Sequence, residues 1–244
     1  MNLTCIDIGN TNIVIGTYNN NKLIDVSRLE TNQTNFDSAL DLKNSNYIAI
    51  SSVVPSIEFF LVNHLNSKDL FFVSYLKSNI NLDVDMPKDV GNDRICNIKA
   101  ALAENLYPSI IVDFGSATTY DVINDKGHFI GGVIAPGIDV SAEHLFNKAE
   151  QLEKVPLKFP QNVIGKNTIT NLQSGIMYGG IDAINGMLYR IKKEMNDSIK
   201  YIVLTGGFST ILSEHITHLH SIDQNLTLKG IKLIWEENHK KLNQ

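Results

Sequence analysis

Two short stretches of this sequence place an aspartate two residues before a glycine, where an apolar run gives way to small residues. They are Asp7-Ile8-Gly9-Asn10-Thr11 and Asp113-Phe114-Gly115-Ser116-Ala117. The glycine of such a turn leaves backbone N–H groups open to a phosphate. The aspartate can hold Mg²⁺ or its waters, and the metal then bridges the phosphates. The pair of turns therefore predicts a clamp for the phosphates of ATP.

The plainer interpretation of each aspartate is that it only caps a turn, which is common for this residue type. The repetition argues against it. Asp113 follows Asp7 by 106 residues (113 − 7 = 106), the residues after each aspartate keep this offset, and both motifs lie between apolar stretches. A repeat of this period is typical of two similar α/β halves. The nucleotide cleft is then expected between the halves.

A third stretch that could do chemistry is Val90-Gly91-Asn92-Asp93-Arg94-Ile95. Here Asp93 could accept a proton while the guanidinium of Arg94 holds an anion beside it. The alternative is an aspartate at the N-cap of a helix, followed by an arginine on the solvated face. Taken alone, these residues favour the alternative.

The elements that must position these residues alternate between strand and helix. Runs of β-branched and apolar residues predict strands, and apolar residues at helical spacing predict a helix that begins near Arg94 and ends before Pro108. The expected strands are 2–8, 13–18, 22–28, 47–54, 129–137 and 201–207, with 109–123 repeating the strand and turn of the opening; further helices are expected after 55, over 138–152 and after 207. This order predicts an α/β fold of two domains, 1–108 and 109–244.

Composition and missing motifs exclude several classes of function. The chain has 21 Lys and Arg against 26 Asp and Glu, for a formal net charge of −5. That balance disfavours a nucleic-acid partner bound through phosphate neutralisation and favours a small-molecule substrate. The sequence has no Walker P-loop, no G-x-G-x-x-G after a strand and no G-x-S-x-G elbow, which disfavours P-loop NTPases, dinucleotide oxidoreductases and serine hydrolases.

The cysteines and the apolar runs predict the compartment. Cys5 and Cys96 are the two cysteines, far apart and without C-x-x-C spacing, so neither a disulfide framework nor a structural zinc is expected. No stretch approaches the roughly 18 apolar residues that a membrane span needs. The sequence therefore predicts a cytoplasmic protein with no membrane partner.

Two groups of residues are expected to be structural. His215, His218 and His220 lack Cys or Asp at ligand spacing, so we expect them on the surface rather than at a metal. Glycines 175, 179, 180 and 186 interrupt a helix-like stretch, where close packing of helices is favoured over ligand contact.

Six motifs in series resemble those of type III pantothenate kinases over nearly the whole chain. They are D-I-G-N-T at 7–11, G-N-D-R at 91–94, D-F-G-S-A-T-T at 113–119, G-G-V-I-A-P-G at 131–137, G-K-N-T at 165–168 and T-G-G at 205–207. The resemblance implies the actin/Hsp70/sugar-kinase fold with two ribonuclease-H-like domains. It also implies transfer of the ATP γ-phosphoryl group to pantothenate, the first step of coenzyme A biosynthesis. A homodimer that uses K⁺ or NH₄⁺ besides Mg²⁺ is implied as well.

Carried over by position, the resemblance assigns a role to each matching residue. Asp93 is implied as the general base, and Asp113 as the ligand of the monovalent cation. The implied ATP-binding residues are Asp7, Ile8, Gly9, Asn10, Thr11, Asn12, Ile13, Val14 and Ser116, and the implied pantothenate-binding residues are Gly91, Asn92, Asp93, Arg94 and Thr168.

The sequence departs from the family pattern at three of its positions. Ser116 stands where threonine is common, which keeps the hydroxyl; Val84 stands where an aromatic residue is common; and Asn92 replaces a small residue. With valine at position 84, the sequence leaves open which side chain would pack against pantothenate at this point.

Two other functions remain open at the level of sequence. One is a phosphotransferase of the same fold that acts on a different small alcohol or acid. The other is a nucleotide-sensing protein without turnover, which the presence of Asp93 together with Asp7 and Asp113 disfavours, because such a protein needs no base.

Overall fold

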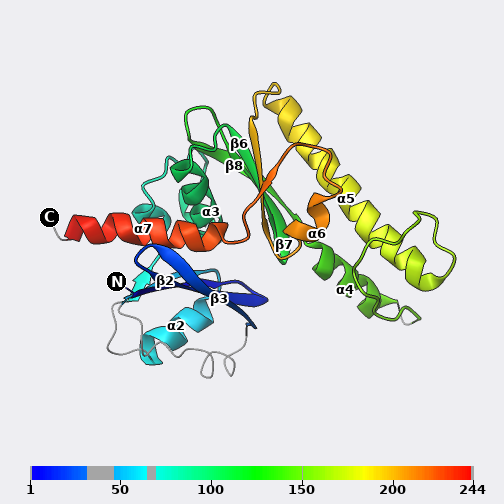
Figure 1. Cartoon of the computed structure of the whole chain (residues 1–244), viewed down its shortest axis with the longest axis horizontal. Coiled ribbons are helices and arrows are strands. Elements are labelled where there is room, and N and C mark those ends of the chain that lie inside the picture. The colour runs from blue at the N-terminus through cyan, green and yellow to red at the C-terminus, as the bar shows by residue number, and fades with distance from the viewer. Residues whose placement is uncertain (1, 32–46, 65–69, 150, 243–244) are drawn as a thin grey trace. The chain divides into compact units, whose positions relative to one another are not determined.

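The computed structural model describes residues 2–31, 47–64, 70–149 and 151–242. Contacts divide the chain into two units, Met1–Asn105 with Asn225–Gln244, and Leu106–Gln224 (Figure 1). The first unit contains β1 (Asn2–Ile8), β2 (Asn12–Asn19), β3 (Lys22–Glu30), β4 (Tyr47–Ser52), α2 (Pro55–His64), β5 (Leu70–Phe72), η2 (Tyr75–Lys77), η3 (Pro87–Asp89), α3 (Asn92–Ala103) and α7 (Leu226–Leu242). The second contains β6 (Ser109–Phe114), β7 (Ala117–Ile123), β8 (Phe129–Pro136), α4 (Ile138–Lys148), α5 (Thr168–Glu194), β9 (Tyr201–Gly206), α6 (Ser209–Ser213) and β10 (Ser221–Ile222).

The two units share one sheet topology. The first sheet has the order β3-β2-β1-β4-β5, and the second has the order β10-β9-β6-β7-β8. In each, the first three strands form an antiparallel meander, and the last two run parallel to the first strand of that meander. The predicted doubling is therefore confirmed at the level of topology, with β6 in the place of β1.

The repeat is not exact in length, and here the sequence comparison was wrong. Gly9 N donates to Asn12 O at 2.9 Å, whereas Gly115 N donates to Ala117 O at 3.1 Å. The second turn is thus one residue shorter, and the constant offset ends at the glycine. A turn can lose a residue without disturbing its strands, because the meander pairing resumes directly after it.

Most predicted elements are present, with small shifts at their ends. The strand expected at 47–54 ends at Ser52, and the helix expected over 138–152 ends at Lys148. The glycine-interrupted stretch forms one helix of 27 residues, α5. The turn between β7 and β8 is closed by Gly127 N donating to Asn124 O, with Gly127 at φ 75°.

The C-terminal helix returns to the first unit, although the sequence placed it in the second half. Its side chains Leu226, Ile231, Ile234 and Trp235 are buried, and α7 packs on α3 and β1 (Figure 1). An amphipathic helix must cover its apolar face, and α3 offers a matching one. Within the described residues, no helix is both long and apolar enough to cross a bilayer.

Candidate active site

The first turn lies at the carboxyl end of β1, in the middle of its sheet. Asp7 pairs in register with Val14 on one side and Ser51 on the other. Thr31 braces the turn, because its Oγ1 donates to Gly9 O at 2.8 Å. The Ile8 and Ile13 side chains are fully buried, so a ligand in this turn can reach those two residues only through their backbone.

The start of α3 lies beside that turn. Asn92 Nδ2 donates to Ser52 O at 3.1 Å, at the end of β4, and Val53 N donates to Ile8 O at 3.0 Å. The start of α3 is therefore hydrogen-bonded to the carboxyl end of β4, and the residue after β4 is hydrogen-bonded to the carboxyl end of β1. The N-cap is Gly91, and Asp93 is the second residue of the helix. The alternative of an aspartate N-cap is thus wrong.

The charges of Asp93 and Asp7 both affect one buried thiol, that of Cys96. Burial raises the pKa of Cys96 well above its usual range, and the nearby charges of Asp7 and Asp93 raise that pKa further. Burial likewise raises the pKa of Asp93, while the backbone N–H and the charge of Arg94 oppose the shift. A carboxylate at a helix start whose pKa is raised by burial is a candidate proton acceptor.

The Asp93 carboxylate folds back over Gly91. Its Oδ1 accepts a hydrogen bond from Arg94 N at 2.8 Å, and it lies 2.5 Å from the point where a Cβ of residue 91 would stand. A side chain at position 91 would therefore push the carboxylate aside. Gly91 has φ −55°, which alanine adopts without strain.

We expect Gly91→Ala to lower kcat by about 10- to 100-fold, because a displacement of roughly 1 Å is enough for such a loss. The melting temperature should change little, since the atom in the way is the end of a flexible side chain. Steady-state kinetics measure this loss. The double variant Gly91→Ala/Asp93→Asn tests whether the loss arises through displacement of the Asp93 carboxylate. The alanine should have almost no further effect when Asp93 is already replaced; additive losses would contradict the mechanism.

The second turn is enclosed by two glycines. Gly206, at φ 86°, has its missing Cβ 2.5 Å from Asp113 Oδ1 and 2.6 Å from Phe114 N. Gly137 N donates to Ser116 O at 3.0 Å. Asp113 is half-buried, and so is Ser116 on the two-residue turn Gly115-Ser116. The structure thus gathers the end of β6, the end of β9 and the start of α4 around Asp113.

Thr168 lies at a different place in the second unit. It is the first residue of α5 and lines a cavity of about 690 Å³, together with Thr118 on β7 and Pro136 on β8. The cavity lies between α4 and α5. A reciprocal capping box of Asn167 and Thr170 fixes the helix start. Gly165 is packed so closely against Asn171 that no side chain would fit there.

One local motif near the site was missed at the level of sequence. Gly137 is the N-cap of α4, and Asp139 Oδ1 accepts from Val140 N at 2.8 Å. This repeats the geometry of Gly91 and Asp93. The signal was present as G-I-D-V against G-N-D-R, but a glycine two residues before an aspartate is too common to stand out.

The structural groups are only partly as expected. His215, His218 and His220 are each partly exposed, and the ring of His215 contacts that of Phe159 at a tilt of 33°, with centroids 3.7 Å apart. Of the four glycines in α5, Gly180 is packed, with Ile138 Cδ1 3.0 Å from its missing Cβ. The other three have open space there, so close helix packing explains Gly180 alone among them.

The donor set fits a metal that is shared with a substrate. Within the described ranges, no group of three or more His, Cys, Asp or Glu side chains could enclose an ion. Mg²⁺ in kinases is held by one or two carboxylates plus substrate phosphates, and single carboxylates at Asp7 and Asp113 fit that pattern. Asp113 Oδ1 and Phe114 O lie 2.5 and 2.6 Å from the missing Cβ of Gly206, so the absence of a side chain at Gly206 leaves room beside the carboxylate.

Comparison with known proteins identifies a family. The model described as type III pantothenate kinase matches residues 3–190. A type III pantothenate kinase of Exiguobacterium sibiricum is 37% identical over 250 residues, covering 96% of this chain and 98% of the relative. A Campylobacter jejuni structure, described as a Baf family transcriptional activator, has a TM-score of 0.64 at 24% identity and covers 97% of this chain and 99% of its own. A Listeria monocytogenes structure, described as an N-acetylmannosamine kinase, has a TM-score of 0.56 at 12% identity, covering 98% and 100%.

Proposed function

Because this chain belongs to the type III pantothenate kinase family, we propose that it transfers the γ-phosphoryl group of ATP to the primary hydroxyl of pantothenate. The product is 4'-phosphopantothenate, at the entry to coenzyme A biosynthesis. The predicted resemblance and the actin/Hsp70/sugar-kinase fold class are confirmed. The protein is a kinase that phosphorylates an alcohol. The alternative function of a nucleotide-sensing protein without turnover is therefore no longer favoured.

One observation supports the assignment of the base: Asp93 is half-buried at the start of α3, and this helix start is hydrogen-bonded to the end of β4, next to the end of β1 that carries Asp7. In the proposed reaction, Asp93 accepts the proton of the pantothenate hydroxyl as that oxygen bonds to the γ-phosphorus. The bond from phosphorus to the β,γ-bridging oxygen breaks, and ADP leaves. Such a transfer depends on in-line positioning and charge neutralisation more than on covalent help. Arg94 supplies a positive charge next to the base.

The remaining site residues are assigned by what they can present. The turn and strand from Asp7 to Val14, with Ser116, are proposed to contact ATP, and Mg²⁺ would neutralise phosphate charge there. Gly91, Asn92, Arg94 and Thr168 are proposed to contact pantothenate, besides Asp93. Asp113 is proposed to hold the monovalent cation, K⁺ or NH₄⁺.

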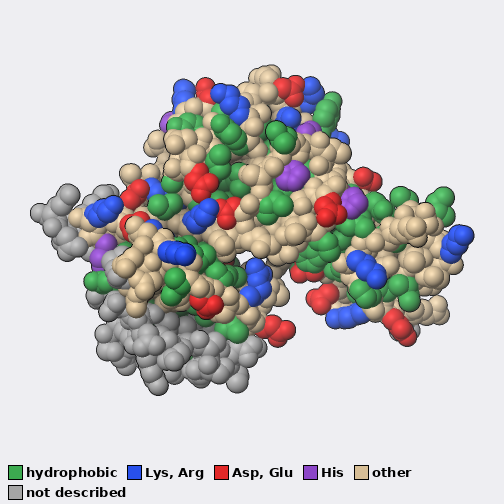
Figure 2. Space-filling view, viewed as in Figure 1, with side chains coloured by type: hydrophobic (Ala, Val, Ile, Leu, Met, Phe, Trp, Pro, Cys, Tyr) green, Lys and Arg blue, Asp and Glu red, His purple; other side chains and the backbone are tan. Residues whose placement is uncertain are grey.

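We also propose a homodimer, through the α4 and α5 side of the second unit. Figure 2 shows hydrophobic side chains over this part of the surface. Val163, Ile164 and Ile169, before and at the start of α5, are 55–85% exposed, and Thr168, next to Ile169 in the chain, lines the cavity between α4 and α5. Apolar patches of this kind mark protein interfaces more often than free surface. Sedimentation of the purified protein tests this.

The test of substrate and cation is one assay. Phosphorylation of pantothenate by ATP and Mg²⁺ should be at least tenfold faster in K⁺ than in Na⁺ at equal ionic strength, and Asp113→Ala should remove that difference. Mass spectrometry of the product checks the acceptor. If a panel of small alcohols yields a better acceptor and pantothenate gives only background, the enzyme is a phosphotransferase with another substrate. Equal rates in both salts would contradict the assignment of Asp113 as the ligand of a monovalent cation.

A further inference from the structure

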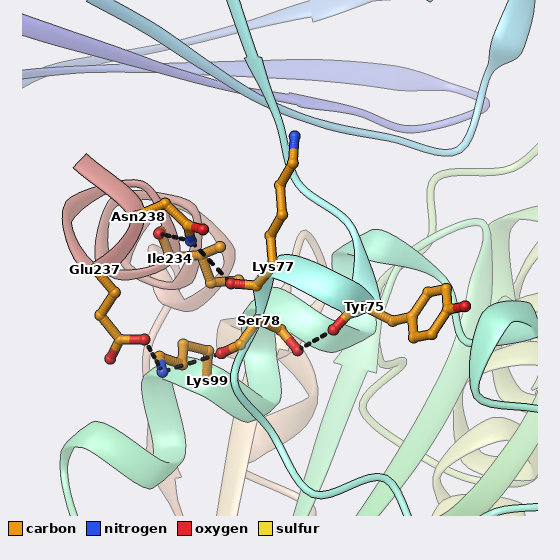
Figure 3. A network of polar contacts seen from close by, with 7 residues as sticks. All are labelled: Tyr75, Lys77, Ser78, Lys99, Ile234, Glu237 and Asn238. Atoms are coloured by element: carbon orange, nitrogen blue, oxygen red, sulfur yellow. Dashed lines mark hydrogen bonds and ion pairs between the residues drawn. The ribbon is translucent and has the colours of Figure 1, made fainter. Parts of the chain in front are cut away.

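The inner side of α3 carries a charged residue among apolar ones. Lys99 is 7% exposed, next to the fully buried Ile98 and Ala101. A buried ammonium is unfavourable unless it is paired and hydrogen-bonded. Lys99 Nζ pairs with Glu237 Oε2 of α7 at 2.7 Å and donates to Ser78 O at 3.1 Å (Figure 3). The charge therefore connects three separate parts of the first unit.

The connected part of greatest interest is the short helix η2. Ser78, fully buried, closes it by donating from Oγ to Tyr75 O at 2.7 Å. Asn238 Nδ2 on α7 donates to Lys77 O at 2.9 Å, as Figure 3 shows. Two successive carbonyls, those of residues 77 and 78, are thus held by α7 and α3. The end of η2 is fixed from both helices.

The segment 79–90, here named the strap, joins this fixed point to the proposed site. It leaves Ser78 beside Lys99 and ends at the buried Val90, directly before Gly91. Lys99 lies six residues after Asp93, which is about 9 Å along a helix. The strap is therefore a loop that is closed on α3 at both ends. Its own regular structure is the single turn η3 and a β-bridge at Leu82, so the course of the residues between Ser78 and Leu82 depends on the attachment at Ser78.

We propose that Lys99 is a positioning residue for the acceptor substrate, because it fixes where the strap begins relative to Asp93. The proposal rests on the function proposed above. The strap contains Val84, and it feeds directly into the residues proposed to contact pantothenate. Losing the Lys99 attachment frees the start of the strap while the helix that carries Asp93 keeps its apolar packing. The effect should therefore appear in substrate binding rather than in the chemical step.

The test variant is Lys99→Met, which keeps the length of the side chain and removes its charge and both bonds. We expect the KM for pantothenate to rise at least tenfold, with kcat changed less than threefold and the KM for ATP unchanged. Trypsin should cleave after Lys88 in the strap at least tenfold faster than in the wild-type protein. Asn238→Ala, which releases the Lys77 carbonyl from the surface of α7, should raise the same KM about threefold and serves if Lys99→Met does not fold.

The matched control is Lys229→Met. Lys229 Nζ pairs with Glu104 Oε1 at 2.9 Å, another ion pair between α7 and the end of α3, but one that is 41–45% exposed and remote in sequence from η2. It should change neither the KM nor the cleavage. Equal KM values for Lys99→Met and Lys229→Met would overturn the proposal, and so would faster cleavage with an unchanged KM. Failure of the function itself would be seen beforehand, as a wild-type protein that does not phosphorylate pantothenate.

Discussion

Replacing Asp93 by asparagine is expected to lower kcat by about 10²–10⁴, the range typical of a lost general base. Asparagine keeps the shape of the side chain and can still accept the hydrogen bond from Arg94 N. What it loses is the ability to take a proton from the attacking hydroxyl. The KM for ATP should stay within about threefold of the wild-type value. Steady-state kinetics with pantothenate measure both quantities.

The structure provides a matched control for this variant. Asp139 occupies the same helix position in α4, with the same hydrogen bond from the following N–H. Asp139→Asn should lower kcat by less than about threefold. The comparison separates the general effect of losing a carboxylate at a helix start from the specific effect of losing the base. Near-normal turnover of Asp93→Asn would show that another group takes the proton.

The raised pKa of Asp93 sets the direction of its pH dependence. Burial favours the protonated form, so the carboxylate is lost, as pH falls, at a higher pH than the ordinary aspartate value of about 3.9. The acid limb of kcat/KM should lie correspondingly higher. The same shift means that the ionised carboxylate destabilises the fold at neutral pH. Asp93→Asn should therefore melt higher than the wild-type protein at pH 7, and this advantage should shrink as pH falls through the raised pKa and be absent below about 4.

Replacing Gly230 by alanine is expected to give the largest loss of stability. Gly230 lies in α7 where it crosses α3, and its missing Cβ would overlap the Cys96 carbonyl and lie 2.6 Å from Cys96 Cα. These are backbone atoms, so the two helices must move apart. Overpacking of this kind costs about 1–3 kcal/mol and occasionally more. For a chain of this size, each kcal/mol lowers the melting temperature by about 2–4 °C.

The same substitution of glycine by alanine in the middle of α5 should raise the free energy of unfolding instead of lowering it. Gly186 is also inside a helix, but no atom lies within 4 Å of its missing Cβ. Gly186→Ala should stabilise the protein by about 0.5–1 kcal/mol, because alanine loses less backbone freedom than glycine in a helix. Urea unfolding followed by circular dichroism measures both. Trp235, the one tryptophan, lies buried in α7 and reports on the first unit by fluorescence. A Gly230→Ala protein as stable as the wild type would contradict the tight crossing.

Much of the fold could be predicted because its signals are local. An apolar run that ends in Asp-x-Gly determines a strand and a turn within a few residues, and finding it twice predicted the two sheets. The family and its chemistry followed from six short motifs, because motif order is kept when a fold is kept. The positions of Asp7, Asp93 and Asp113 at strand and helix ends needed no knowledge of distant contacts.

What tertiary structure alone decided depends on residues far apart in the chain. That α7 belongs with α3 depends on the contact between Gly230 and Cys96, which no local pattern reports. That Gly91 is the N-cap and Asp93 is half-buried depends on β4, 40 residues earlier, which receives the hydrogen bond of Asn92. No local pattern pairs the buried Lys99 with Glu237, 138 residues later, or with the carbonyl of Ser78, and these two partners make its burial tolerable. Sequence determines which groups exist; packing between distant segments determines which of them lose water, and with it their charge and their freedom to move.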